Sequence, residues 1–432
     1  MSLEGAIAAN GNTRGWNIIA LRSLLSQSKA DNRPDLPLLG VNLHSGVTQR
    51  SANDGRPAAS EDLTAYKVVA PGNIIMNRLG KPHGSVGMSP WNGITSPAYW
   101  VMGINPQLGE PRFLHHLLRS RHLVAEYERL GKNQPPNQFD ISWDAFRAIE
   151  VPLPPLEEQR RIADYLDTEI ARIGRLTAAR DAQLSLLEER ELAVIRHMLS
   201  GGATSQGGRP TDWPWLPHIP ADWSIGPVYA YYSTDLGKML NAERASGEKL
   251  HPYLRNANVH WYEINTADMA SMHFEADEVR RYSVAPGDLL VCEGGAGVAE
   301  AAVWDGRIEE CYFQKSLHRV RQSSEVPVEW LMYWLRFAKA CGVFDASGNL
   351  ATIPHLTGEQ LRQYRIPIPH DGQSMIRETG RKISDMAKAR TLLNTAQKGL
   401  SERRQALITA AVTGQFDVST ASGRNVTDGV NA

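Results

Sequence analysis

An internal repeat limits what this chain can fold into more than any other feature of its sequence. VAPGNIIM, from Val69, lies over VAPGDLLV, from Val284, at a spacing of 284 − 69 = 215 residues. VPLP, from Val151, lies over IPIP, from Ile366, and 366 − 151 is again 215. This period is far longer than the 20–50 residues of solenoid repeats. The sequence therefore predicts two copies of one large folding unit.

The spacing changes only slightly further along the chain. Arg147 falls on Arg362, so that 362 − 147 = 215, whereas IRHMLSGG from Ile195 lies over ITAAVTGQ from Ile408, so that 408 − 195 = 213. Two short deletions near the helix would explain the shift. We expect a tandem duplication in which each copy has a globular domain followed by a long helix.

The composition is typical of a water-soluble globular protein. The chain has 432 residues, 42% of them hydrophobic and 22% charged, with a formal net charge of −1. We expect two or three domains from this length. No run approaches the roughly 18 apolar residues of a membrane span, and no signal peptide is evident at the beginning. The expected location is the cytoplasm, with no membrane partner.

Each copy contains short apolar runs separated by turn residues. YKVVA, GNIIMNRL and AYWVMGIN in the first copy are broken by Pro, Gly and Asn, and GDLLVCEG repeats the pattern in the second. Helical spacing follows between Arg112 and Leu130 and again in EWLMYWLRFAKACG. The predicted fold class is α+β, with two mostly β domains.

A helix of about 45 residues is predicted after each domain. The first begins at PPLEEQRR, where proline suits the first helical turn and Glu157 and Glu158 favour the helix dipole. Gly201 and Gly202 end it. The second has apolar residues at seven-residue steps, which is typical of a coiled coil, and Asp371 as its predicted N-cap. Residues predicted for the helix-helix or partner contacts are Leu166, Ile170, Ile173, Leu187, Met386, Leu393, Leu400 and Leu407.

Two long helices in this order predict an antiparallel spacer with one domain at each end. At ~1.5 Å per residue each helix is roughly 65–70 Å long, and a helix of this length with a narrow apolar face needs a partner. The predicted segments are a first recognition domain at 1–153, a helix at 154–202, a second recognition domain at 203–368, a helix at 369–418 and a disordered tail at 419–432.

Two similar domains held apart suit a target with two short features at a fixed distance. Duplex DNA is such a target, because paired domains can read half-sites about 34–36 Å apart.

Four stretches of the sequence carry a more specific resemblance. PLPPLEEQRRIADYLD, SERRQALITAAVTGQFDV, GDLLVCEGG and FQKSLHRVR are similar to the specificity subunits of Type I restriction-modification systems, and the resemblance covers almost the whole chain. It implies two target recognition domains, separated by two long helices, that read a bipartite site on double-stranded DNA. It also implies docking to two modification (methyltransferase) subunits, with restriction (translocase and nuclease) subunits joining for cleavage.

The resemblance further implies that the chain performs no chemistry of its own. S-adenosylmethionine, ATP and Mg would then be bound by the partner subunits, and this chain would bind no cofactor. The motifs agree. GGAG at Gly294 to Gly297 lacks the Gly-Lys-Ser/Thr of a P-loop, so a tight turn or a close approach to DNA phosphate is expected. NQPPNQF, from Asn133, departs from the Asn-Pro-Pro-Tyr loop of adenine methyltransferases, so a plain loop is favoured.

No metal site is predicted. Cys292, Cys311 and Cys341 are widely spaced with no Cys-x-x-Cys pair, which favours buried reduced thiols. His115 and His116 are neighbours on a helix, whose side chains point to different faces, so packing or a surface role is favoured over a shared metal.

The candidate DNA contacts lie in a glycine-bearing loop of the first domain, MNRLGKPHGSVG, and in FQKSLHRVRQ beside the glycine loop of the second domain. Arg and Lys can position phosphates or bind guanine, and Asn can pair with adenine. The alternative for the second loop is a strand whose His318 or Arg319 forms hydrogen bonds within the domain. The candidates are Asn77, Arg78, Lys81 and His83 in the first domain and Gln314, Lys315, His318 and Arg319 in the second.

Two other functions compete with a specificity subunit. One is a stand-alone bipartite DNA-binding regulator, and the other is a coiled-coil scaffold that does not bind DNA. DNA binding that requires methyltransferase subunits would separate the three.

Overall fold

The chain has an α+β fold whose contacts divide it into two compact units. The computed structural model describes residues 15–28, 30, 32–43, 45–50, 62–79, 85–134, 138–203, 207–240, 250–344 and 355–418. Unit 1 comprises Met1–Arg180 and Asn394–Ala432, and unit 2 comprises Asp181–Leu393. Each unit thus combines one predicted recognition domain with parts of both long helices. The predicted domain boundaries stay a prediction, and the tail from Ser419 lies outside the described residues.

Unit 1 is organised around a four-stranded sheet in the order β2-β9-β6-β7, with antiparallel pairing throughout. Ile74, Met76 and Met102 place its buried face in the main hydrophobic core. Its strands are β2 (Leu25–Gln27), β6 (Ile74–Met76), β7 (Val86–Met88) and β9 (Trp100–Ile104). Paired strands around it are β1 (Asn17–Ala20) with β12 (Glu150–Leu153), β3 (Leu39–Asn42) with β4 (Gly46–Gln49), β5 (Lys67–Val69) with β8 (Gly93–Thr95) and β10 (Lys132–Gln134) with β11 (Gln138–Asp140).

The region with helical spacing after β9 forms two helices, not one. They are α3 (Pro111–Leu118) and α4 (Arg121–Leu130). Ser120 adopts an extended backbone, with φ −65° and ψ 150°, and interrupts the helix. Phe113 and Leu117 of α3 are buried against the sheet. The remaining helices of the domain are α2 (Leu21–Leu24) and α5 (Trp143–Arg147).

Unit 2 has a four-stranded sheet in the order β16-β24-β21-β22. Its strands are β16 (Tyr232–Leu236), β21 (Leu289–Cys292), β22 (Ala301–Val303) and β24 (Leu317–Gln322). A second sheet has the order β20-β17-β23, from β17 (Leu250–Leu254), β20 (Ala270–His273) and β23 (Tyr312–Phe313). Its other paired strands are β13 (Gly208–Pro210) with β14 (His218–Pro220), β15 (Ser224–Pro227) with β25 (Arg365–Ile368) and β18 (Val259–His260) with β19 (Glu263–Ile264).

The helix α8 (Val328–Ala340) is the centre of the unit 2 core. Ten of its residues, from Val328 to Ala338, are buried, and the indole of Trp330 donates a hydrogen bond to the Pro367 carbonyl of β25 at 2.8 Å. It follows the last strand of the four-stranded sheet, as α3 does in unit 1. The smaller helices are η1 (Val228–Ala230), η2 (Asn256–Asn258), α7 (Ala276–Tyr282) and α9 (Gly358–Gln363).

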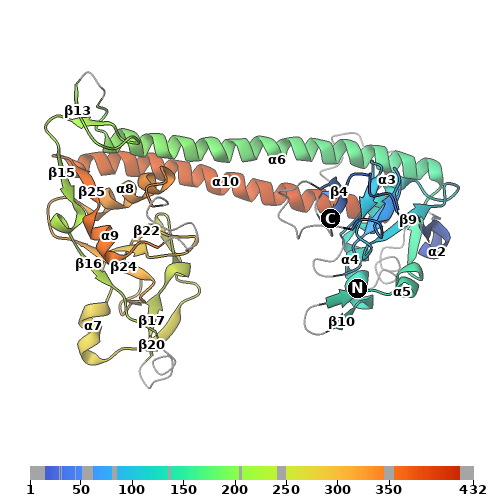
Figure 1. Ribbon diagram of the computed structural model, residues 1–432, viewed down its shortest axis with the longest axis horizontal. Helices are drawn as coiled ribbons and strands as arrows, with labels where there is room; N and C mark the ends of the chain where they lie inside the picture. The colour runs from blue at the N-terminus through green and yellow to red at the C-terminus, as the bar shows by residue number, and fades with distance from the viewer. Residues whose placement is uncertain are drawn as a thin grey trace. The chain divides into compact units, whose positions relative to one another are not determined.

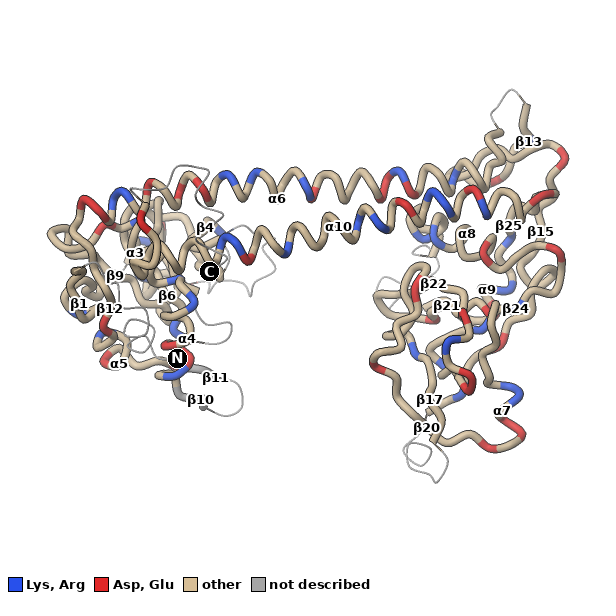
Figure 2. The backbone as a smooth tube through the Cα atoms, turned by 180° about the vertical axis from the view of Figure 1, so that it is seen from behind, with Lys and Arg blue, Asp and Glu red and all other residues tan. Residues whose placement is uncertain are grey.

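Two long helices contribute a segment to each unit (Figure 1). They are α6 (Leu156–Leu199) and α10 (Gly372–Val412). The carboxylate of Asp371 accepts a hydrogen bond from the Ser374 backbone at 3.1 Å, which confirms Asp371 as the N-cap of α10. Gly201 and Gly202 follow the end of α6 with φ of +56° and +71°, a conformation that glycine adopts at little cost. Figure 2 shows acidic and basic residues along both helices.

Within each unit, segments of α6 and α10 pack in the same core as the domain. In unit 1, Ile162, Ala163 and Leu166 share the core with Leu407, Ile408, Ala411 and Val412. In unit 2, Ile195, Met198 and Leu199 share it with Ile383 and Met386. Arg390 contacts Glu191 there, so the later residues of α6 meet the earlier residues of α10. The two segments are therefore antiparallel in unit 2.

The predicted helix contacts differ in burial. Leu166, Ile173, Met386 and Leu407 are buried. Ile170 and Leu187 are half-buried and pack against the cores, and Leu393 and Leu400 are half-buried. Continuous coiled-coil pairing along the helices stays a prediction.

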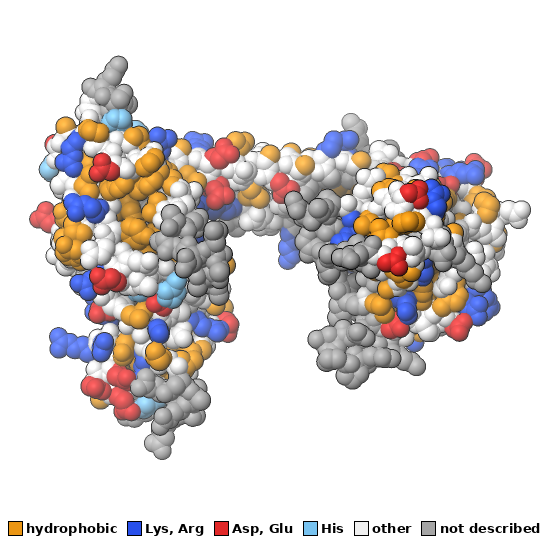
Figure 3. Space-filling model, in the orientation of Figure 1, with side chains coloured by type: hydrophobic (Ala, Val, Ile, Leu, Met, Phe, Trp, Pro, Cys, Tyr) orange, Lys and Arg blue, Asp and Glu red, His pale blue; other side chains and the backbone are white. Residues whose placement is uncertain are grey.

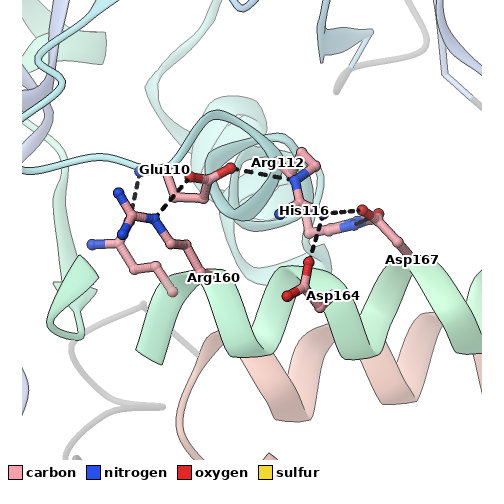
Figure 4. A network of polar contacts seen from close by, with 7 residues as sticks. Glu110, Arg112, His116, Arg160, Asp164 and Asp167 are labelled. Carbon is pink, nitrogen blue, oxygen red and sulfur yellow. Dashed lines mark hydrogen bonds and ion pairs between the residues drawn. The ribbon is translucent and has the colours of Figure 1, made fainter. Parts of the chain in front are cut away.

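A network of exposed polar contacts attaches α3 to α6 in unit 1 (Figure 4). The guanidinium of Arg112 donates to Asp164 at 2.8 Å and to Asp167 at 3.1 Å. His116 Nε2 lies 3.1 Å from the same Asp167 carboxylate. The Arg112 and Arg160 guanidiniums lie 3.3 and 3.7 Å from Glu110. Ile162 and Leu166 already hold α6 against the domain through apolar contacts in the core. The polar contacts add hydrogen bonds, which depend on orientation, between α3 and α6.

The three cysteines are free thiols. Cys292 and Cys311 are buried, as expected, and burial raises the pKa of each to about 12. The expectation of burial is wrong for Cys341, which is exposed just after the end of α8. Among the described helices, none is long and apolar enough to cross a membrane.

Candidate nucleic-acid interface

The glycine loop of unit 2 is a tight turn that follows a fully buried strand. All four residues of β21 are buried, and the chain then reaches Gly294 to Gly297. The Val298 backbone donates to the Gly295 carbonyl at 3.1 Å, and Gly295 has φ +79°, which closes the turn. The predicted turn is confirmed.

Polar side chains gather around this turn, and we call Asn256, Gly294, Gln314, Lys315 and Ser316 the glycine-loop cluster. The Asn256 amide donates to the Gly294 carbonyl at 2.8 Å. The Ser316 hydroxyl accepts from the Asn256 backbone at 3.2 Å and donates to Gln314 Oε1 at 2.8 Å. Lys315 is exposed, whereas Gln314 and Asn256 are half-buried. The cluster therefore presents one cation at the surface, with the half-buried amide of Gln314 beside it, whereas the Asn256 Oδ1 is buried.

The turn from Gln314 to Ser316 is held in place by the end of β16. The Lys315 backbone donates to the Lys238 carbonyl at 2.9 Å, and the Lys238 backbone donates to the Phe313 carbonyl at 3.1 Å. A Cβ at Gly237 would lie 2.3 Å from the Gln314 carbonyl oxygen, which is too close for any side chain. Glycine at position 237 thus allows the backbone after β16 to lie directly against the backbone of Gln314. The hydrogen bonds between these two segments fix the backbone position of Lys315.

His318 and Arg319 lie inside unit 2, which does not favour a contact with DNA. His318 is 1% exposed, its Nε2 lies 2.8 Å from the Leu356 carbonyl, and burial lowers its pKa. Arg319 is 4% exposed and donates to the Arg281 and Ser283 carbonyls at 2.9 and 2.6 Å and to Asp235 at 2.7 Å. Both side chains join elements of unit 2 by hydrogen bonds. This agrees with the alternative prediction that His318 or Arg319 bonds within the domain and does not contact DNA.

The first-domain candidates are only partly described. The Arg78 guanidinium donates to both Asp140 oxygens at 2.8 and 2.9 Å, so it joins the end of β6 to β11. The Asn77 side chain accepts from the Leu79 backbone at 3.0 Å and shapes the local turn. Both are half-buried and keep some access to solvent. Lys81 and His83 lie outside the described residues.

The sequence did not predict that Asn256 and His355 lie beside the glycine loop. His355 is 54% exposed and its Nε2 lies 3.3 Å from the Glu293 carboxylate. Gly294 also forms an isolated bridge with His355. Asn256 and His355 are far from Gly294 along the chain, so no local pattern could have joined them.

Charge alone does not mark the interface. Figure 3 shows acidic and basic side chains interspersed over the face of unit 2 that it draws. Many arginines of the unit are paired within it, such as Arg321 with Asp288 at 2.6 Å and Arg255 with Asp268 at 3.0 Å. Contacts with DNA would therefore depend on individual side chains such as Lys315.

The paired histidines of α3 have structural contacts. His115 Nδ1 accepts from the Met88 backbone at 3.1 Å, and burial lowers its pKa to about 3. His116 faces Asp167 instead. Within the described ranges, no three His, Cys, Asp or Glu side chains gather as a metal site. The segment NQPPNQF includes residues 135–137, which lie outside those ranges.

Comparison with known proteins finds a family model that is similar to part of the chain. Residues 66–186 match the type I restriction modification DNA specificity domain. The match begins just before β5 and includes residues of α6 up to 186, so the similarity spans both the domain and the first part of its helix.

Two curated relatives carry the same description. The chain is 30% identical over 160 residues to the type I restriction enzyme EcoKI specificity subunit of Escherichia coli (strain K12), covering 37% of this chain and 31% of that protein. It is 23% identical over 172 residues to the putative type I restriction enzyme MjaX specificity subunit of Methanocaldococcus jannaschii, covering 38% of each. The alignments thus span about a third of the length of these relatives.

The fold similarity extends over nearly the whole chain. A solved structure described as the basis of complex assembly and conformational transition of the type I R-M system matches 93% of this chain and 98% of its own, with a TM-score of 0.64. The sequence identity is 17%, so this match concerns the fold.

Proposed function

We propose that this chain, which carries a type I restriction modification DNA specificity domain and is related to type I specificity subunits, selects the DNA sequence for a type I restriction-modification complex. Each recognition domain reads one half of a bipartite, interrupted site. The helices α6 and α10 set the separation between the half-sites and dock two modification subunits.

The observation that carries this proposal is the position of the family domain within a duplicated chain. Residues 66–186 match the specificity domain, and unit 2 repeats the sheet order and the helix that follows the last strand. Two domains of one plan, each continuous with a long helix, support two half-sites on one duplex.

The chain itself is proposed to be non-catalytic and to work with double-stranded DNA, modification subunits and restriction subunits. S-adenosylmethionine, ATP and Mg would belong to those partners. The glycine-loop cluster supports a binding role, because it presents the exposed Lys315 beside the half-buried amide of Gln314, and such groups can contact phosphates or base edges.

The experiment is methylation sequencing of a plasmid from a naive host that expresses this chain with its cognate modification subunit. Each protein expressed alone is the control. We expect adenine methylation at one interrupted sequence only when both are present. A stable complex with an active modification subunit and no methylation would favour the scaffold, and specific DNA binding by this chain alone would favour the regulator.

A further inference from the structure

The turn from Gln314 to Ser316, which joins β23 to β24, fixes the orientation of one side-chain amide. The Leu317 backbone closes the turn by donating to the Gln314 carbonyl at 2.9 Å. The Asn256 backbone donates to Ser316 Oγ at 3.2 Å, and the Ser316 hydroxyl donates to Gln314 Oε1 at 2.8 Å. The Glu293 backbone donates to the Ser316 carbonyl at 2.9 Å, so Ser316 is itself held in place. The oxygen of the Gln314 amide therefore faces Ser316.

The other end of this amide is a hydrogen-bond donor that the fold does not use. Among the described residues, no acceptor lies within hydrogen-bond distance of Gln314 Nε2. A side-chain amide has one acceptor oxygen and one amino group with two donors. Because Ser316 holds the oxygen, the group that Gln314 offers to a ligand is the amino group. Lys315 beside it is exposed and forms no ion pair in the part of the chain that the structure describes.

Unit 1 contains the same turn with different side chains. Strand register aligns β9 with β24 at 320 − 102 = 218, because Met102 and Val320 pair with equivalent residues of β6 and β21. Gln314 therefore corresponds to Ser96, and the turn in unit 1 has the sequence Ser-Pro-Ala. The Tyr99 backbone donates to the Ser96 carbonyl at 3.0 Å, which is the same closing bond. The backbone of the turn is thus shared, whereas its amide and its cation occur only in unit 2, as expected for a position that contacts different bases in the two units.

We propose that Gln314 reads one base of the half-site bound by unit 2, and that this base is guanine or thymine. The inference rests on the proposed function and adds the chemical class of the base. In the major groove, guanine O6 and thymine O4 accept hydrogen bonds, whereas adenine N6 and cytosine N4 donate them. The Nε2 donor matches guanine or thymine and would face another donor on adenine or cytosine. Ser316 is a positioning residue, because its hydroxyl holds the amide oxygen and leaves the donor for the base.

The test is methylation sequencing with the variant Gln314→Glu, expressed as the full chain with the cognate modification subunit. The carboxylate is similar in size and can still accept from Ser316, but it offers an acceptor where the amide offers a donor. At one position of one half-site, guanine or thymine should be replaced by adenine or cytosine. The exchange between these classes is detectable on either strand, because each base pair contains one base of each class. Methylation of the original sequence should fall by about tenfold, which is typical for one lost base contact.

Variants of Ser316 test the positioning role. Ser316→Ala allows the amide to turn over, so both classes of base should be methylated at this position. Ser316→Thr keeps the hydroxyl and should restore the original preference. A merely structural role would lower methylation of all sequences without changing the base.

Two controls accompany these variants. Gln322→Glu has the same charge change at the exposed, opposite end of β24, and it should keep the original sequence. The half-site that Gln314 does not read should stay the same in every variant, which verifies folding and assembly in the same experiment.

Two results with Gln314→Glu would overturn the proposal. They are an unchanged sequence at every position, or a change within one class, such as thymine in place of guanine. If Gln314→Glu abolishes methylation, Gln314→Ala decides instead. One position that then accepts all four bases supports the proposal, whereas an unchanged sequence or a second complete loss overturns it. Failure of the proposed function is distinguishable, because the original chain would then direct no methylation to an interrupted sequence.

Discussion

Both units attach their domains to the long helices through pairs of arginine and carboxylate side chains. The pairs are exposed in unit 1 and buried in unit 2. In unit 1, Arg112 pairs with Asp164 and Asp167, and these side chains are 38%, 67% and 44% exposed. In unit 2, Arg336 pairs with Glu191, and these side chains are 10% and 3% exposed. Exposed pairs contribute little to stability, whereas removal of one partner from a buried pair is costly. The ion pairs that attach the two domains to the long helices therefore differ in their expected contribution to stability.

The largest effect is expected at the centre of the buried cluster. Glu191→Ala leaves the buried guanidinium of Arg336 with only the more exposed Glu188 carboxylate, and it also removes the acceptor of Tyr262 and Arg390. We expect a loss of about 3–5 kcal/mol in the free energy of unfolding of unit 2, measured by urea denaturation. Glu189→Ala, two residues earlier and exposed, should change it by less than about 0.5 kcal/mol. Similar losses in the two variants would contradict the comparison.

Arg319 is a candidate DNA contact that, like Arg336, is a buried arginine with partners inside unit 2. Arg319→Ala removes the side-chain donor of the Arg281 carbonyl and one of the two arginine donors of the Ser283 carbonyl. We expect a loss of about 1–3 kcal/mol in stability, measured by the same denaturation. Weaker DNA binding with unchanged stability would instead assign Arg319 to the interface.

Lys315 should behave in the opposite way, because it is exposed. If Lys315 contacts a phosphate, Lys315→Ala is expected to weaken binding of the assembled complex to duplex DNA by about five-fold and to lower the salt dependence by about one counterion. The Tm should not change. Fluorescence anisotropy across a salt series checks this, and an unchanged slope would remove Lys315 from the interface.

The smallest effect is expected in the exposed network of unit 1. Hydrogen bonding and charge from His116, together with Arg112, hold the pKa of Asp167 below its usual value. A lowered pKa means that the carboxylate stabilises the fold above the unfolded value of about 4 and that this contribution disappears as the pH falls further. Asp167→Asn should cost at most about 0.5–1 kcal/mol at pH 7, given its exposure.

The pH series provides the control for this variant. The stability difference between the original chain and Asp167→Asn should shrink as the pH falls below about 4. A difference that stays constant down to pH 3 would show that the cost comes from packing instead of charge.

The sequence predicted the features that depend on local pattern. The two long helices and the Asp371 cap follow from residue periodicity and from one side-chain hydrogen bond, which neighbouring residues determine. The break at Ser120 was missed, because the apolar spacing continues across it and only the backbone there becomes extended. The buried positions of His318 and Arg319 depend on Leu356, Arg281 and Asp235, which lie on other elements.

The site was less predictable than the fold for the same reason. Lys315 and Gln314 were predicted from the polar segment FQKSLHRVRQ and stay candidates for DNA contact. Asn256 and His355 reach that loop only through tertiary contacts.

The most direct measurement exchanges one recognition domain and reads both halves of the methylated site. Residues 207–368 would be replaced by the corresponding domain of a related specificity subunit, and plasmid methylation would be sequenced with the cognate modification subunit present. If each unit reads one half-site, one half of the methylated sequence changes while the other half and their separation stay the same. A change in both halves, or methylation of the original sequence, would contradict independent recognition by the two units.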